Sequence, residues 1–296
     1  MLTRPNPMVS SAENKPVTAI IAGGGRLPID LAKSLISRGS PIYVVMIAGE
    51  VENPEAFATF PHTTIELEAA GGVLSHLRSR GVSQLVFAGT VARRPRLLAM
   101  RPILPLLAVL PKLMTALGRG DDALLRSLVA HVEGHGIKVL GAHEILPELL
   151  VPEGVHTKRR PTKSDMRDIE AALAAARAIG ILDIGQAAIA IGGRAIALEG
   201  VEGTDGLLDR VAKLRDHGRL AGKTGGVLVK SVKPGQEWRT DLPGIGVQTV
   251  DGASTAKLNG IAVVADSTLA MGFKEIIERA DSLGIFVMGL HAEQKV

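Results

Sequence analysis

The chain has 296 residues, with 34 Lys and Arg against 30 Asp and Glu, a formal net charge of +4 and no cysteine. The missing cysteines exclude disulfides and zinc–thiolate sites, and they fit a reducing cytoplasm. Aromatic residues make up only 2% of the chain, so few side chains can stack on bases, and no nucleic-acid partner is predicted.

The length and the aliphatic composition predict two α/β domains with parallel strands. The mild basic excess favours a phosphorylated ligand or an anionic membrane surface. Residues 1–15 are polar and contain proline, and we expect them to be a mobile tail, because they lack the apolar core of a signal peptide. Nowhere does an apolar run reach the ~18 residues of a membrane span.

The first predicted unit is strand, glycine loop and helix. Val17–Ala22 is a β-branched run that leads into Gly23, Gly24 and Gly25, and a helical pattern then runs to Ser37. A following strand, 41–48, completes a right-handed βαβ unit. The loop reads GGGRLP rather than G-x-G-x-x-G, so three interpretations stay open: NAD binding, another nucleotide or phosphate contact, or a turn without a ligand.

A helix over 72–80, a strand over 84–88 and a strand over 137–140 extend the same pattern. Ligands of open parallel sheets bind beyond the carboxyl ends of the strands, so Gly89 is a candidate for a substrate contact, and Arg93 and Arg94 either face a phosphate or are solvated. Leu97–Met114 is strongly apolar but contains three prolines. It packs in the core or forms an apolar wall for acyl chains or a membrane surface.

The clearest break in the pattern is Val151–Lys163, which is basic and punctuated by Pro and Gly. We therefore predict a Rossmann-like domain with a parallel sheet over 16–148, a linker over 149–165 and a mixed α/β domain over 166–296, around an interdomain cleft. In the second half, helices are expected over 168–179, 206–215, 246–258 and 274–283, and strands over 187–191, 194–198, 226–232, 261–265 and 285–290. Gly192 and Gly193 predict a two-residue hairpin turn between the first two of these strands.

An acidic cluster, EGVEGTD, precedes the helix over 206–215 and contains Glu199, Glu202 and Asp205. Carboxylates at a helix N-terminus are favourable without any function. Three of them within seven residues also suit a hard divalent cation. Both interpretations stay open.

Lys230–Thr249 combines charged residues with Pro and Gly and has neither a helical nor an alternating period. Such a segment is a loop, and loops on a rigid scaffold carry much of the chemistry of enzymes. It is either a solvated surface turn or a loop that handles a phosphate-containing substrate with Asp241 as its key carboxylate.

Taken together, seven motifs resemble the LpxI-type UDP-2,3-diacylglucosamine pyrophosphatases of bacterial lipid A biosynthesis. They occur in the order of that family and span nearly the whole chain after residue 15. The motifs are AGGGRLP (22–28), FAGTVARRP (87–95), GDDALLR (120–126), GAHE (141–144), DIGQ (183–186), EGTD (202–205) and KPGQEWRTDLPGIGVQT (233–249).

The resemblance implies hydrolysis of the pyrophosphate of UDP-2,3-diacylglucosamine to lipid X (2,3-diacylglucosamine 1-phosphate) and UMP, with a divalent metal, Mg²⁺ or another divalent cation. It also implies that the family's critical aspartate, in the motif ending R-x-D-L-P, is Asp241. An amphiphilic substrate suggests a cytoplasmic enzyme with peripheral contact to the inner membrane, and base rates for soluble enzymes favour a homodimer.

The remaining site residues follow from their chemistry, because a pyrophosphate needs cations to neutralise its charge and carboxylates to hold a metal and activate water. The predicted catalytic residues are Asp241, Lys233, Arg239 and Gln236. The predicted substrate-binding residues are Gly23, Gly24, Gly25, Gly89, Arg93, Thr204 and Lys230. The predicted metal ligands are Glu202, Asp205 and Asp241. The alternatives are a nucleotide-binding oxidoreductase and a non-catalytic lipid-binding protein of similar fold.

Overall fold

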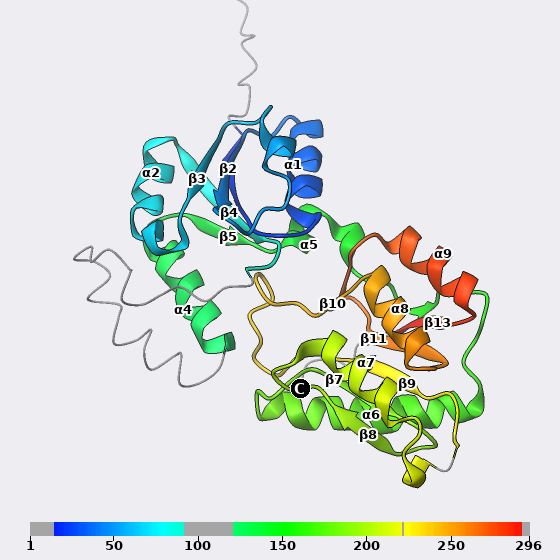
Figure 1. The fold of residues 1–296 in the computed structure, drawn as a ribbon. Helices are drawn as coiled ribbons and strands as arrows, with labels where there is room; N and C mark the ends of the chain where they lie inside the picture. Colours follow the sequence, from blue (N-terminus) through cyan, green and yellow to red (C-terminus); the bar gives the residue numbers. More distant parts are fainter. Residues whose placement is uncertain (1–14, 92–120, 221, 292–296) are drawn as a thin grey trace, which may run out of the picture. The chain divides into compact units, whose positions relative to one another are not determined.

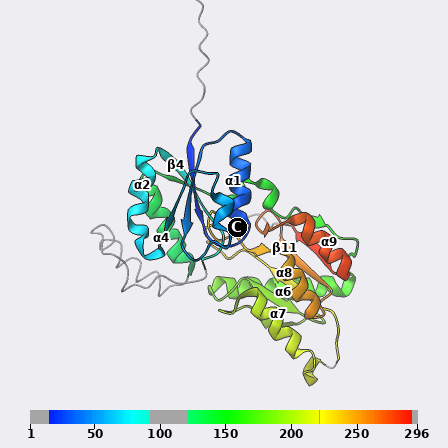
Figure 2. The same ribbon diagram turned by 45° about the horizontal axis from the view of Figure 1, so that its top comes forward.

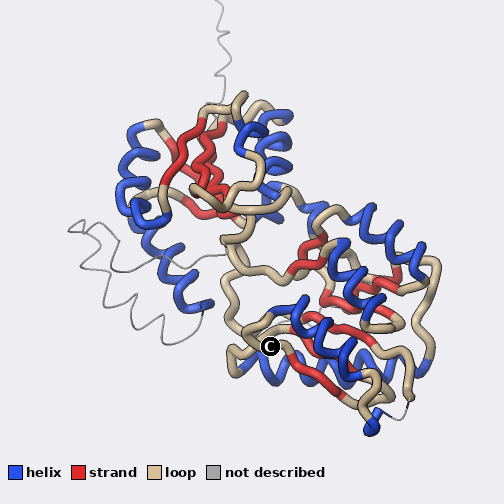
Figure 3. Tube along the Cα trace, in the orientation of Figure 1, coloured by secondary structure: helices blue, strands red, loops and turns tan. Residues whose placement is uncertain are grey.

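The structure is a computed structural model that describes residues 15–91, 121–220 and 222–291. It divides into two compact units, one of residues 1–103 with 132–139 and the other of residues 104–131 with 140–296. Nearly all of the expected tail and the whole of Leu97–Met114 lie outside the described residues. Each unit contains a sheet with helices beside it (Figure 3), which confirms the predicted α/β class.

The sheet of the first unit has the strand order β3-β2-β1-β4-β5, and its pairs β3·β2, β2·β1 and β1·β4 are parallel. Figure 2 shows α1 and α2 on opposite faces of this sheet. The strands are β1 (Val17–Ala22), β2 (Ile42–Ile47), β3 (His62–Ile65), β4 (Val82–Ala88) and β5 (Lys138–Leu140). The helices of this unit are α1 (Leu27–Ser37), η1 (Pro54–Phe57), η2 (Leu67–Gly72) and α2 (Val73–Ser79). The division of the chain cuts through α4 (Asp121–Gly134) and assigns α5 (Ala142–Ile145) to the second unit.

The sheet of the second unit is mixed, with the order β6-β13-β11-β9-β7-β8, and a short parallel pair, β10·β12, stands apart from it. Its strands are β6 (Gly154–Val155), β7 (Ala187–Ala190), β8 (Ala195–Leu198), β9 (Val227–Lys230), β11 (Gly260–Val264) and β13 (Phe286–Leu290), and the pair is β10 (Gly244–Ile245) with β12 (Leu269–Ala270). Its helices are η4 (Pro147–Leu149), α6 (Lys163–Ile181), α7 (Gly203–Leu214), η5 (Gly218–Leu220), α8 (Val247–Thr255) and α9 (Phe273–Leu283).

Two apolar layers enclose the second sheet, because neighbouring residues of each strand face opposite sides. One layer joins Ala188 and Val229 to α6, and the other joins Ile189 and Leu228 to α7, α8 and α9. Figure 1 shows α6 on one side of the sheet and the three other helices on the other side. The sheet is therefore buried on both faces, and its edges are where polar side chains can gather.

The segment predicted as a linker carries structure of its own. Val151 is fully buried, and its N–H donates to the carbonyl of Thr268 at 2.9 Å. β6 then adds an antiparallel edge strand to β13. The N-terminus of α6 follows at once, because the Thr162 hydroxyl accepts from the N–H of Asp165. Residues 151–165 thus pack on the second unit, and aperiodic sequence here reflects a two-residue strand too short to show a period.

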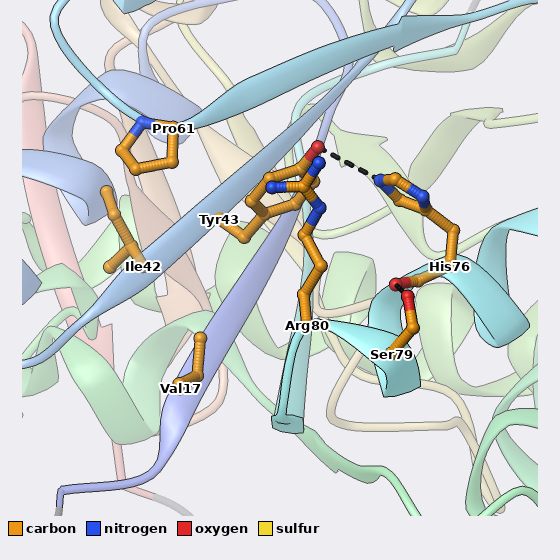
Figure 4. Close-up of a pocket in the computed structure, with 7 residues that line it drawn as sticks. All are labelled: Val17, Ile42, Tyr43, Pro61, His76, Ser79 and Arg80. Atoms are coloured by element: carbon orange, nitrogen blue, oxygen red, sulfur yellow. Dashed lines mark hydrogen bonds between the residues drawn. The ribbon is translucent and has the colours of Figure 1, made fainter.

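The first unit has a hollow of about 670 Å³ at the amino ends of β1 and β2 (Figure 4). In it, the hydroxyl of Tyr43 lies 3.1 Å from Nε2 of His76, and the guanidinium of Arg80 lies 4.8 Å from the centre of the Tyr43 ring. These polar groups contact one another. The hollow is also at the opposite strand ends from the glycine loop, so none of the predicted site residues lines it.

Within the described residues, we find no helix that is both long enough and apolar enough to cross a membrane.

Candidate functional site

The candidate site lies at one edge of the second sheet, where β8 and β9 end and β7 begins. The edge is closed by two backbone hydrogen bonds, from Ser231 to the carbonyl of Gln186 at 2.9 Å and from Glu199 to the carbonyl of Ala187 at 2.8 Å. Because β7 runs antiparallel to both neighbours, its first residue meets the last residues of β8 and β9. Three segments far apart in sequence therefore place their polar side chains together.

The loop of residues 231–246 is held in shape largely by one buried amide, that of Gln236. Its Oε1 accepts from the N–H of Lys233 at 2.8 Å, and its Nε2 donates to Oδ2 of Asp241 at 2.9 Å. The same Nε2 also donates to the main-chain carbonyl of Asp241 and, at 3.3 Å, to Oε1 of Gln186. Gln236, predicted as catalytic, thus lies where it orients the Asp241 carboxylate.

Asp241 remains partly open to solvent, with 29% of its side chain exposed. The ammonium of Lys233 lies 4.0 Å from its Oδ2 and forms a closer ion pair, 2.7 Å, with Oδ1 of Asp183. An accessible carboxylate held by an amide, with a cation beside it, is suited to orient or deprotonate a water molecule. The structure therefore brings three of the four predicted catalytic residues together.

The fourth predicted catalytic residue, Arg239, makes a two-pronged pair with Glu237. Its Nε lies 2.7 Å from Oε1 and its Nη2 donates to Oε2 at 2.9 Å. The hydrogen bond from Arg239 lowers the pKa of the Glu237 carboxyl below its ordinary value. Part of the Arg239 charge is thus balanced inside the loop, and its catalytic role stays a prediction.

Lys230 ends β9 as a deeply buried cation, with 5% of the residue exposed. Its Nζ donates to the carbonyl of Gly244 at 2.8 Å, which ties the sheet to the start of β10. Burial lowers the pKa of the Lys230 ammonium, and the carboxylates of Glu199, Asp205 and Asp241 act in the opposite direction. Lys230, which the sequence predicts to bind substrate, is therefore buried beneath the site, and its ammonium interacts electrostatically with all three carboxylates.

A hollow of about 420 Å³ opens beside Lys230. It is bounded by the N-termini of α7 and α8, whose first N–H groups favour an anion. The lining residues are Glu202, Gly203, Thr204, Asp205, Lys230, Gly244, Ile245, Gly246, Gln248, Thr249 and Met271. The lining thus combines donors for phosphate oxygens, from the two helix N-termini and Lys230, with two carboxylates, those of Glu202 and Asp205.

The predicted metal ligands are only partly assembled. Glu202 is exposed and pairs with Arg210 at 2.5 Å, whereas Asp205 lies in range of Lys230. Among the residues that the structure describes, no group of three or more His, Asp or Glu side chains is arranged to hold a metal ion. Any cation here would need ligands from the substrate, which is the usual manner of Mg²⁺ at phosphate sites.

Thr204, predicted as a substrate contact, lines the hollow and donates its hydroxyl to Oε1 of Glu199 at 2.7 Å. Glu199 also accepts, through Oε2, from the N–H of Gln186 at 2.8 Å. Glu199, Gln186 and Asp183 were absent from the predicted site set. Gln186 and Asp183 lie in the DIGQ motif, so the motif was the signal that could have found them.

Two of the three glycines predicted to bind substrate, Gly23 and Gly24, take part in a backbone contact within the first unit. Gly23 and Gly24 donate their N–H groups to the carbonyls of Ala88 and Thr90, each at 2.8 Å. A Cβ on Gly23 would lie 2.3 Å from the Thr90 carbonyl oxygen, so this glycine permits close backbone approach. Gly89 lies in the same contact, with φ 86°.

The loops that follow β1 and β4 are thus hydrogen-bonded to each other, at the point where the strand order of the sheet reverses. The N–H groups of Gly23 and Gly24 are both used in this contact, and a substrate contact of these two glycines stays a prediction. Gly25 has φ 85° and open space around it, and its predicted role stays a prediction. Arg93 lies outside the described residues.

Comparisons with known proteins cover both units. The model of the LpxI N-terminal domain matches residues 17–149, and that of the LpxI C-terminal domain matches residues 152–288. A protein of Caulobacter vibrioides, named UDP-2,3-diacylglucosamine pyrophosphatase LpxI, is 40% identical over 278 residues, which is 93% of this chain and 98% of the relative.

Solved structures resemble the chain only distantly. A CobK precorrin-6A reductase is 14% identical, with coverage of 95% of this chain and 90% of its own and a TM-score of 0.32. A UDP-glucose 4-epimerase of Thermus thermophilus in complex with NAD is 11% identical, with coverage of 94% and 87% and a TM-score of 0.28. Likenesses at these scores carry no argument about this chain.

Proposed function

This chain belongs to the LpxI family, and from that premise we propose that it hydrolyses the pyrophosphate of UDP-2,3-diacylglucosamine to lipid X and UMP. The observation that carries the proposal is the 40% identity to a pyrophosphatase of that name over nearly the full length of both chains. The edge of the second sheet supports it, because it combines a hollow suited to phosphate with an accessible, oriented carboxylate.

Binding of the pyrophosphate is assigned to the hollow at the N-termini of α7 and α8. The helix ends offer N–H groups, and the buried ammonium of Lys230 adds a positive charge without reaching into solvent. Thr204 is kept in place by Glu199. A preorganised set of donors of this kind stabilises the charge that grows on phosphate oxygens in the transition state.

Activation of water is assigned to Asp241. Gln236 fixes its carboxylate by donating to Oδ2, and the ammonium of Lys233 lies close enough to neutralise charge beside it. Asp241 accepts a proton from water as the water oxygen bonds to one phosphorus of the pyrophosphate. The bond from that phosphorus to the bridging oxygen breaks, and the other phosphate leaves with the bridging oxygen.

We propose Mg²⁺ as the cofactor, with Asp205 and Asp241 as its protein ligands and phosphate oxygens of the substrate completing the shell. Two observations support this choice: Asp205 lines the hollow assigned to the pyrophosphate, and Asp241 acts electrostatically on the same buried ammonium of Lys230. When bound, the ion would polarise the phosphoryl oxygens. Glu202 is a weaker candidate than the sequence suggested, because Arg210 already pairs with it.

The substrate carries two acyl chains and is amphiphilic. We therefore propose peripheral contact with the cytoplasmic face of the inner membrane and, on base rates for soluble enzymes, a homodimer. Analytical ultracentrifugation and flotation with anionic vesicles test these two proposals separately from the activity.

A single assay tests the activity and both alternatives. Purified protein is incubated with UDP-2,3-diacylglucosamine and Mg²⁺, with and without EDTA, and UMP is quantified. We expect UMP that EDTA abolishes, and release of UMP that is at least about 100-fold slower from Asp241→Asn. Asp251→Asn is the matched control, because Asp251 is an exposed carboxylate paired with Arg279 on α9.

The failing outcomes are distinct. Binding of NADH without release of UMP would support an oxidoreductase, and binding of the lipid without turnover would support a lipid-binding protein. Release of UMP that EDTA does not change would support the proposed activity and contradict the proposed metal.

A further inference from the structure

Asp183 lies two residues after the last residue of α6, and its backbone is left-handed, with φ 54°. Its N–H donates to the carbonyl of Gly180 at 3.1 Å, and the N–H of Ile184 donates to the carbonyl of Ile179 at 3.0 Å. These two bonds form the Schellman ending of a helix, in which the left-handed residue is usually glycine.

An aspartate is poorly suited to this position for two independent reasons. Its Cβ makes the left-handed backbone less favourable than it is for glycine. Its charge also lies at the negative end of the helix dipole, where cations are favoured. The same ending is made by Gly284 after α9 and by Lys257, also with φ 54°, after α8. Only Asp183, of these three, opposes both preferences.

An ion pair between the side chain of Asp183 and the loop of residues 231–246 compensates for this unfavourable backbone and charge. Its Oδ1 lies 2.7 Å from Nζ of Lys233, and the Lys233 side chain is only 13% exposed. Lys233 in turn lies 4.0 Å from Oδ2 of Asp241. The ammonium thus lies within 4.0 Å of two carboxylates, one just after α6 and one in the loop, and the one after α6 is the closer.

We infer that Asp183 is a positioning residue for hydrolysis: it holds the ammonium of Lys233 beside Asp241 and the reacting phosphate. The inference rests on the proposed function. A cation held at a fixed point contributes most where charge develops, so its loss acts on kcat more than on KM.

The first test compares substitutions that separate backbone strain from charge. Asp183→Gly relieves the left-handed backbone, and Asp183→Asn keeps the shape of the side chain and removes its charge. We expect both to lower kcat about 10–100-fold, the scale of a misplaced group, with KM changed far less. We also expect Asp183→Gly to melt at or above the wild-type temperature. Lys257→Gly, at the same φ on another helix, is the control and keeps wild-type kcat.

The second test asks whether Asp183 acts through Lys233. In a Lys233→Met background, Asp183→Asn should change kcat by less than about twofold, because residues that act as one unit are not additive. Independently of activity, the ¹⁵N signal of the Lys233 ammonium should be visible in the wild type, be absent in Lys233→Met and broaden in Asp183→Gly.

The outcomes are separable. Wild-type kcat in both Asp183 variants, or additive losses with Lys233→Met, overturns the positioning role. An ammonium signal that is unchanged in Asp183→Gly overturns the ion pair on which it rests. A wild-type protein that releases no UMP overturns the proposed function, and the ammonium signal still decides whether Asp183 holds Lys233.

Discussion

Lys230→Met is the substitution that most directly tests the electrostatics of the site. Methionine has nearly the length of lysine and suits an apolar environment, so the substitution removes the ammonium with little change in packing. It also removes the hydrogen bond to the carbonyl of Gly244. Because that bond is partly buried, leaving the carbonyl without this partner should cost about 1 kcal/mol of stability at every pH, the lower end of the usual range.

The ionisation of Lys230 adds a part that depends on pH. Burial lowers its pKa in the folded protein, while in the unfolded chain the value is close to 10.4. Between the lowered value and 10.4 the unfolded chain therefore binds more protons, and stability rises with pH. One proton corresponds to about 1.4 kcal/mol per pH unit at most. Below the lowered value, and above the unfolded one, the contribution is constant.

The assay is urea unfolding followed by tryptophan fluorescence. The chain has one tryptophan, Trp238, and it lies in the loop of the second unit, so the signal reports on the unit that contains Lys230. Wild type and Lys230→Met are compared at several pH values from about 6 to 10, a range that reaches toward the unfolded pKa, and at constant ionic strength. Other ionisations cancel in the difference, which should grow in favour of the wild type as pH rises.

A difference that stays constant over this pH range would refute the reasoning. It would mean that Glu199, Asp205 and Asp241 fully offset the burial of the ammonium and leave its pKa unchanged on folding. A difference that shrinks with rising pH would mean that these carboxylates raise the pKa of Lys230 on folding. The charge of Lys230 would then stabilise the folded protein.

Three further predictions concern the site and the first unit. Asp241→Asn should lower kcat about 10²–10⁴-fold, as for loss of a general base, with KM and melting temperature nearly unchanged in steady-state and thermal assays. Asp205→Asn should raise the Mg²⁺ concentration for half-maximal activity, whereas Glu202→Gln should change kcat/KM less than about fivefold, because its ion pair is exposed. A wild-type Mg²⁺ titration for Asp205→Asn would contradict the metal role, and the acidic cluster would then only stabilise the N-terminus of its helix. Gly23→Ala should destabilise the first unit by about 1–3 kcal/mol, because its Cβ would lie 2.3 Å from a backbone oxygen. Gly72→Ala, with no atom within 4 Å, is its control in hydrogen exchange.

Much of the fold could be predicted because it depends on local pattern. The hairpin turn at Gly192 and Gly193 is confirmed, with φ 65° and 76° between the antiparallel strands β7 and β8. The sequence did not predict β3 or β6. β3, HTTI, is a polar edge strand with exposed side chains, and β6 has only two residues. Neither offers the apolar period on which strand prediction rests.

The site was less predictable, because its residue types could be read but their partners could not. Lys230 has the charge that a pyrophosphate requires, yet its position at the end of a central strand buries it. Arg239 has the same charge, yet a carboxylate two residues earlier binds it. Whether a cation meets the substrate or holds the scaffold depends on its neighbours in space.

The ion pair between Asp183 and Lys233 shows how such a neighbour could be recognised without a structure. The two residues are 50 positions apart, so no local pattern links them. A carboxylate directly after a helix, where glycine or a cation is preferred, nevertheless conflicts with local preference. Local preference is most often overruled where tertiary contacts compensate, and such positions concentrate at functional sites. A residue that is unfavourable at its own helix end is therefore a better guide to the second layer of this site than the charged loop itself.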